Sequence, residues 1–72
     1  MVELSNSAWA VLEQLSQGSV WDGALVSKEG RNELVEHGLA YRIGGDRLVK
    51  NELTRRGAAI AIHYIIGSKR KH

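Results

Sequence analysis

The segment from Ser27 to Gly57 constrains the fold more than any other part of the sequence, because its helix-capping residues and glycines fix the order of its elements. The Ser27 hydroxyl can accept a hydrogen bond from a free amide of a first helical turn, so it predicts a helix start. Gly38 stands where a left-handed residue ends a helix, with Leu39 as its apolar companion. The segment therefore predicts a helix over Lys28–His37.

A β-hairpin and a second helix are predicted after this first helix. Tyr41–Ile43 and Arg47–Val49 are short runs with β-branched or aromatic residues. They flank the glycine turn Gly44-Gly45-Asp46, which suits positive φ angles. Thr54 follows Leu53 as the cap of a last helix, Thr54–Ile66.

The N-terminal half predicts a long helix and a short one. Leu4–Gln17 is predicted as a helix capped by Ser5 or Ser7, with its apolar face made of Leu4, Ala8, Val11, Leu12 and Leu15. Ser19–Val26 is predicted as a short helix or turn, with Trp21 and Leu25 pointing into the core. Only a residue or two would then separate it from the Ser27 helix, as in a helix-turn-helix corner.

Helix, hairpin and helix in this order resemble the second half of a winged-helix domain. The residues that carry the resemblance are Leu34-Val35-Glu36-His37-Gly38-Leu39, Arg42, the Gly-Gly-Asp turn and Leu53-Thr54-Arg55-Arg56-Gly57. Bacterial winged-helix regulators, the multiple-antibiotic-resistance type among them, have Leu-x-x-x-Gly-Leu, a hairpin and Leu-Thr-x-x-Gly, and short phage DNA-binding proteins are similar in size and order. The resemblance implies an α+β, mostly α fold: a winged helix-turn-helix with three core helices, a short β-hairpin wing and a C-terminal helix.

Length and composition favour one small domain over residues 1–72. The sequence has no cysteine, which excludes disulfides and thiolate metal sites and is consistent with a cytoplasmic protein. No apolar run approaches the roughly 20 residues that span a bilayer. The first residues lack the basic region of a signal peptide, so neither a membrane partner nor export is expected.

Positive charge is concentrated in the second half of the sequence, although the net charge is only +2. Only Asp46 and Glu52 oppose the basic residues there, which are Arg42, Arg47, Lys50, Arg55, Arg56, Lys69, Arg70 and Lys71. Such a surface attracts polyanions, and phosphate is the usual target. The basic tail, residues 67–72, is expected either to fray or to contact phosphate.

The Lys28–His37 helix is the candidate for a DNA major groove. Lys28, Arg31 and Asn32 are expected on its outward face, where arginine can donate twice to guanine and asparagine can pair twice with adenine. The alternative is a solvated helix face on which Arg31 pairs with neighbouring glutamates. The three glutamates Glu29, Glu33 and Glu36 outnumber Lys28 and Arg31, so the helix is mildly acidic, which argues against strong phosphate affinity there.

Contacts to the phosphate backbone are expected from residues at the helix starts and on the wing: Ser27, Arg42, Arg47, Lys50, Arg55 and Arg56. A wing can lie along the backbone or enter a minor groove, where arginine is favoured. The alternative for the hairpin is an edge strand that charges protect against aggregation.

The last helix is apolar nearly all round, and a domain this small cannot cover such a helix alone. A second copy is therefore expected to pack against it by two-fold symmetry. The expected dimer residues are Trp9, Ala58, Ala61, Ile62, Ile65 and Ile66. Trp9 can instead lie at the margin of the core.

No catalytic, metal-binding or phosphate-loop pattern is found in the sequence, and its three histidines are scattered. No enzyme activity, cofactor, metal or small-molecule substrate is expected. The sequence favours a sequence-specific double-stranded DNA-binding homodimer, either a transcriptional regulator or a DNA-architectural factor. The alternative is a winged-helix module that binds protein and not DNA.

Overall fold

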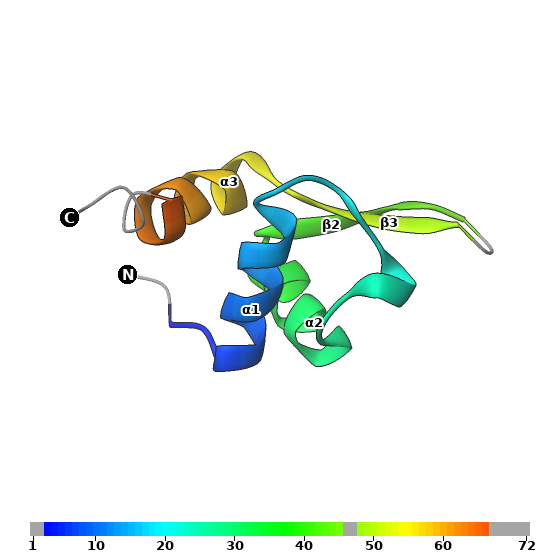
Figure 1. The fold of residues 1–72 in the computed structure, drawn as a ribbon, viewed down its shortest axis with the longest axis horizontal. Coiled ribbons are helices and arrows are strands. Elements are labelled where there is room, and N and C mark those ends of the chain that lie inside the picture. Colours follow the sequence, from blue (N-terminus) through cyan, green and yellow to red (C-terminus); the bar gives the residue numbers. More distant parts are fainter. Residues whose placement is uncertain (1–2, 46–47, 67–72) are drawn as a thin grey trace.

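The fold is a mostly helical α+β arrangement (Figure 1). The computed structural model describes residues 3–45 and 48–66, except for the side chain of Ile66. The elements in chain order are α1 (Asn6–Leu15), β1 (Val20–Trp21), a 3-10 turn (Asp22–Ala24), α2 (Lys28–Glu36), β2 (Ala40–Gly44), β3 (Val49–Leu53), α3 (Arg55–Ala61) and a π-helical turn (Ile62–Ile66).

The three strands form one antiparallel sheet in the order β1-β3-β2. Ala40 pairs with Leu53 near the helices and Gly44 pairs with Val49 at the far end, so the predicted hairpin is confirmed. Its outer end projects away from the helices (Figure 1). The second strand begins later than predicted, at Val49, and the predicted phosphate contact Arg47 lies outside the described residues.

Hydroxyl caps begin all three α-helices, as their sequences predict. The side chain of Ser5 accepts from the Ala8 amide at 3.2 Å, and that of Ser27 accepts from the Gly30 amide at 3.0 Å. Thr54 accepts from the Gly57 amide at 3.1 Å. The caps satisfy amides that the first helical turn leaves free, so these three boundaries depend on local chemistry.

Of the short helix or turn predicted over Ser19–Val26, only a turn is found, the 3-10 turn at Asp22–Ala24. Val20 and Trp21 instead form β1, and the backbone pairs with β3 opposite Asn51 and Lys50. Pairing with β3 supplies hydrogen-bond partners for the backbone of β1. A short helix in its place would be weak, because it would contain Gly23. Trp21 is 46% exposed and does not point into the core as predicted.

The core lies between α1, α2, the start of the hairpin and α3. Its buried apolar residues are Ala8, Val11, Leu12, Leu15, Leu34, Leu39, Ala40 and Ala61. The buried residues of α1 belong to the predicted apolar face, and Leu4 packs at the edge of the same cluster. Gly30 lets α2 approach the backbone of α1 closely, because a Cβ at Gly30 would collide with the Ser7 carbonyl.

The C-terminal segment consists of α3 and the π-helical turn, so it is α-helical over fewer residues than predicted. Hydrogen bonding changes from α-helical to π-helical at Ile62. Ala61 is 2% exposed and Ile62 is 59% exposed, so the chain covers one side of this segment and leaves another side bare. Within the described residues, no helix has the length and hydropathy that crossing a membrane requires.

Candidate nucleic-acid interface

The outward side of α2 is a mixed polar stripe. Lys28 and Asn32 are both exposed, and their spacing of four residues places them on the same side of the helix. Val35, 40% exposed, and Glu36 continue the stripe toward the C-terminal end of α2. The N-terminal half of α2 therefore presents the Lys28 cation, the Glu29 carboxylate and the Asn32 amide to solvent.

Arg31 does not belong to this stripe, which corrects the prediction that it lies on the outward face. The residue is only 7% exposed, and its Nη1 atom forms an ion pair with Asp22 Oδ1. Asp22 lies on the 3-10 turn before α2, within the segment predicted as a short helix or turn. A buried guanidinium must be paired, so this contact holds Arg31 inside the protein.

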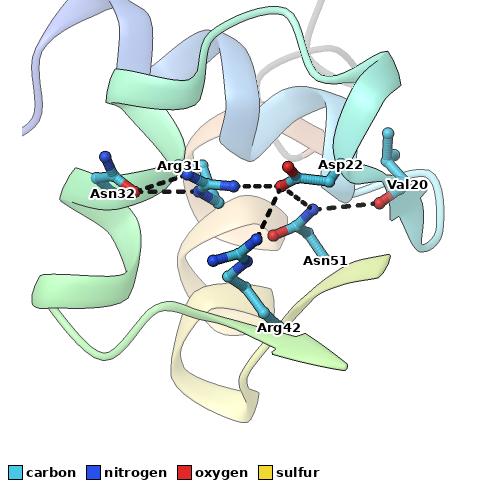
Figure 2. A network of polar contacts seen from close by, with 6 residues as sticks. All are labelled: Val20, Asp22, Arg31, Asn32, Arg42 and Asn51. Atoms are coloured by element: carbon cyan, nitrogen blue, oxygen red, sulfur yellow. Dashed lines mark hydrogen bonds and ion pairs between the residues drawn. The ribbon is translucent and has the colours of Figure 1, made fainter. Parts of the chain in front are cut away.

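Asp22 is the centre of a polar network that joins the 3-10 turn, α2 and both strands of the hairpin (Figure 2). Its Oδ1 atom accepts a hydrogen bond from Asn51 Nδ2 at 3.3 Å and lies 3.7 Å from Arg42 Nη2. Burial raises the pKa of Asp22. The hydrogen bonds from Asn51 and Arg31 and the charges of Arg31 and Arg42 outweigh burial, and they hold the pKa below its usual value.

Asn51 is fully buried in the middle of the sheet. Its Nδ2 atom donates to the Val20 carbonyl at 3.4 Å as well as to Asp22, while its Oδ1 atom has no hydrogen-bond partner among the residues that the structure describes. Sequence reasoning missed both Asp22 and Asn51 as members of this site. No local pattern marks them, because they are brought together across 29 positions of sequence.

Asn32 is connected to the network through its carbonyl oxygen. Arg31 donates to Asn32 Oδ1 twice, from Nε at 3.1 Å and from Nη2 at 2.9 Å (Figure 2). The guanidinium of Arg31 thus bridges Asp22 on one side and Asn32 on the other. The side chain of Asn32 remains exposed at the surface of α2.

The hairpin adds positive charge through Arg42, at the middle of the strand pairing, and Lys50, one pair from the outer end. The Arg42 side chain is 47% exposed although it reaches toward Asp22. Lys50 Nζ lies 4.8 Å from the ring centroid of Trp21, a cation–π contact that leaves the residue half-buried. Either residue can meet a phosphate, and each also has an intramolecular partner that accounts for its position.

The other predicted DNA contacts are placed less favourably. Arg55 and Arg56 are exposed at the start of α3, which follows the end of β3 that is farther from the hairpin turn. The Ser27 hydroxyl already caps α2. Among the described residues, the structure therefore connects Arg42 to Arg31 and Asn32 through Asp22, leaves Lys28 on the same side of α2 as Asn32, and places the α3 arginines elsewhere.

An apolar surface lies at the C-terminal segment. Ile62 is 59% exposed and Tyr64 is 40% exposed. The Tyr64 ring packs edge-on against Trp9, with 5.8 Å between centroids, so Trp9 is half-buried at the margin of the core.

The other predicted dimer residues differ in exposure. Ala58 and Ile65 are half-buried. Ala61 is buried within its own chain and cannot contact a partner as predicted. The side chain of Ile66 lies outside the described part.

Metal chemistry finds no support in the part of the chain that the structure describes, since it contains no group of three or more His, Asp or Glu side chains able to hold an ion. Asp22 and Glu33 there have structural partners. Glu33 accepts from the Ser5 hydroxyl at 2.6 Å and from the Ser5 amide at 2.9 Å. Those bonds lower the pKa of Glu33 and connect α2 to the start of α1.

Comparison with known proteins supports the fold. No protein-family model matches the sequence, and no curated protein matches it. Among solved structures, a mutant of Lactococcus lactis ZitR is similar, with a TM-score of 0.81 and 17% sequence identity. The similarity covers 96% of this chain and 56% of the ZitR chain, so this chain spans little more than half of that protein. At this identity the likeness concerns the fold alone, and together with the element order it supports a winged helix with a three-stranded antiparallel sheet.

Proposed function

We propose that this protein binds double-stranded DNA in the cytoplasm, with α2 in the major groove, and acts as a transcriptional regulator or a DNA-architectural factor without catalytic activity. The observation that carries the proposal is the exposed pair Lys28 and Asn32 on the N-terminal half of α2, beside the half-exposed Arg42. A winged helix reads bases from this part of its recognition helix, and a cation on the wing can meet the flanking phosphate.

The proposed contacts have different tasks. Asn32 reads a base edge, while Lys28 contacts a base edge or a phosphate. Arg42 and Lys50 meet the backbone, and Arg47, outside the described residues, is proposed as a further phosphate contact on its charge alone. Arg55 and Arg56 contribute only if the DNA reaches the start of α3, which makes them the weakest members of the proposed interface.

The proposal includes a homodimer built on the C-terminal segment. Ile62 and Tyr64 expose apolar surface beside Trp9, and apolar surface of this kind is stabilised when a second subunit covers it. A two-fold axis there would present two copies of α2 to DNA, which suits an inverted repeat. Light scattering at micromolar concentration tests this assembly.

A salt series with duplex DNA tests the binding itself. Removal of one phosphate-binding side chain should reduce the slope of log affinity against log salt by about 0.9. Arg42→Ala should therefore flatten the slope by roughly that amount, and Arg55→Ala serves as the comparison at the start of α3. Absence of salt-dependent binding at low ionic strength would exclude the proposed function, and an unchanged slope in the Arg55 variant would remove α3 from the interface.

A protein-binding module is the second candidate, and the surface of the hairpin favours it. Tyr41 and Ile43 are each 42% exposed, and Leu48 is 68% exposed. Apolar residues on a projecting hairpin are well suited to a protein partner. Binding that is insensitive to salt and abolished by Leu48→Ser would support this candidate over DNA.

A further inference from the structure

We propose that Arg31 holds the Asn32 side chain in a state that can only donate hydrogen bonds outward, so that Asn32 reads guanine and not adenine. This inference rests on the proposed DNA-binding function and deepens it. It also changes the expected base, because a free asparagine amide prefers adenine.

The orientation of the Asn32 amide follows from its neighbour. Arg31 donates to one Asn32 atom from both Nε and Nη2, at 3.1 and 2.9 Å. A guanidinium has five donors and no acceptor, so the atom that faces it must be the carbonyl oxygen and not the amide nitrogen. Two donated bonds occupy both lone pairs of that oxygen.

The Arg31 side chain is held in place from its other side. Its Nη1 atom is paired with Asp22, and the residue is only 7% exposed. Turning Arg31 toward DNA would leave Asp22 without its main cation and would require the network in Figure 2 to open. Breaking a buried pair in this way is costly, so the Asn32 oxygen stays occupied when DNA approaches.

The consequence concerns which base edge Asn32 matches. Pairing twice with adenine needs one acceptor for N6 and one donor for N7. Only the two N–H groups of Asn32 Nδ2 remain, and the major-groove edge of guanine offers two acceptors, N7 and O6. Asn32 therefore matches guanine, and Arg31 is the residue that positions it.

Selection from a random duplex pool measures the preference directly. The wild-type protein should enrich a site with one G·C pair whose preference disappears in Asn32→Ala. Replacing that guanine with 7-deazaguanine should weaken wild-type binding roughly 3- to 10-fold, the effect of one hydrogen bond. The same replacement should leave Asn32→Ala unaffected. An A·T pair at the Asn32-dependent position, or no such position, overturns the inference.

Arg31→Lys separates positioning from folding. A lysine keeps a positive charge for Asp22 but lacks the planar fork that reaches Asn32 as well. The freed oxygen should then shift the selected base from guanine toward adenine, which a purely structural residue would not do. An unchanged preference for guanine in this variant contradicts the inference.

The free protein offers a readout that does not involve DNA. NMR should show slower exchange of the Arg31 Nε proton in the wild type than in Asn32→Ala, and equal exchange contradicts the Arg31–Asn32 pair. If no duplex is bound at low salt, the proposed function and guanine reading fail together. Binding with adenine at the Asn32 position overturns only the guanine inference.

Discussion

α2 and the C-terminal segment both begin at a hydroxyl cap, but they are held to the protein in opposite ways. α2 is rich in polar residues, yet two of its own residues, Leu34 and Arg31, are buried. The C-terminal segment is rich in apolar residues, yet Ile62 remains 59% exposed. The comparison teaches that α2 is completed by its own chain and offers polar groups to a ligand. The C-terminal segment offers a surface that an apolar partner would complete.

Asp22→Ala should have the largest effect of the substitutions, because it removes the carboxylate that secures α2. It would leave Arg31 buried without its carboxylate and remove an acceptor from Asn51, which we expect to lower the free energy of unfolding by about 3 kcal/mol. Urea denaturation measures the change. Glu29→Ala, at an exposed position of α2, is the control and should change stability by less than about 0.5 kcal/mol. Equal effects would show that the Asp22 network does not secure α2.

Gly30→Ala tests the close approach of α2 to α1. The added methyl group would meet the Ser7 backbone, and overpacking of this kind costs about 1–3 kcal/mol. Gly23→Ala is the matched control, because a Cβ there has open space. Thermal unfolding of both variants measures the difference. A Gly30 variant as stable as the wild type would contradict the tight helix contact.

Ile62→Ser tests the C-terminal side. If a second copy covers Ile62, removing this apolar side chain should weaken the dimer about tenfold or more, since full burial of such a side chain contributes about 1.5–3 kcal/mol. Sedimentation over a concentration series measures the dissociation constant. Leu48→Ser, on the hairpin and 68% exposed, should leave association unchanged. A wild-type monomer at micromolar concentration would exclude the two-fold assembly.

Glu33→Gln should have the smallest effect, and it tests the contact between α2 and the start of α1. The bonds from Ser5 hold the pKa of Glu33 below its ordinary value of 4.5. A carboxyl that is more acidic in the folded state stabilises the fold above its ordinary pKa, and that contribution is lost as the pH falls through the lowered value. The difference in the free energy of unfolding between the wild type and Glu33→Gln should therefore become smaller as the pH falls through the lowered pKa of Glu33. A gap that stays constant from pH 7 to about pH 2 would contradict the Ser5–Glu33 contact.

Local features of the fold were predictable because their causes are local. A hydroxyl three residues before a helical amide explains the caps at Ser5, Ser27 and Thr54. Gly38 has the positive φ of 72° that its place after α2 predicts. The predicted Gly44-Gly45-Asp46 turn also contains a positive φ, which belongs to Gly44 and not to Gly45.

The candidate site was predictable only in part. The exposure of Lys28 and Asn32 follows from helix periodicity, but the same periodicity placed Arg31 beside them, and the structure turns it inward. An arginine does not reveal from its own position whether an unseen carboxylate will pair with it. The prediction of an outward Arg31 was wrong because its ion pair with Asp22 depends on how the 3-10 turn lies against α2, which the spacing of residues along the chain does not reveal.

By itself, the sequence determined that helices begin after Ser27 and Thr54, that α2 ends before Gly38 and that a hairpin follows it, and it narrowed the cap of α1 to Ser5 or Ser7. Each of these depends on residues within a few positions of one another. Only the tertiary structure decided that Val20 and Trp21 join the sheet and that Arg31 is buried. It also decided that Asp22 meets Asn51, across 29 positions. The physical reason is that pairing of backbone and burial of charge are satisfied by partners distant in the chain, which no local pattern identifies.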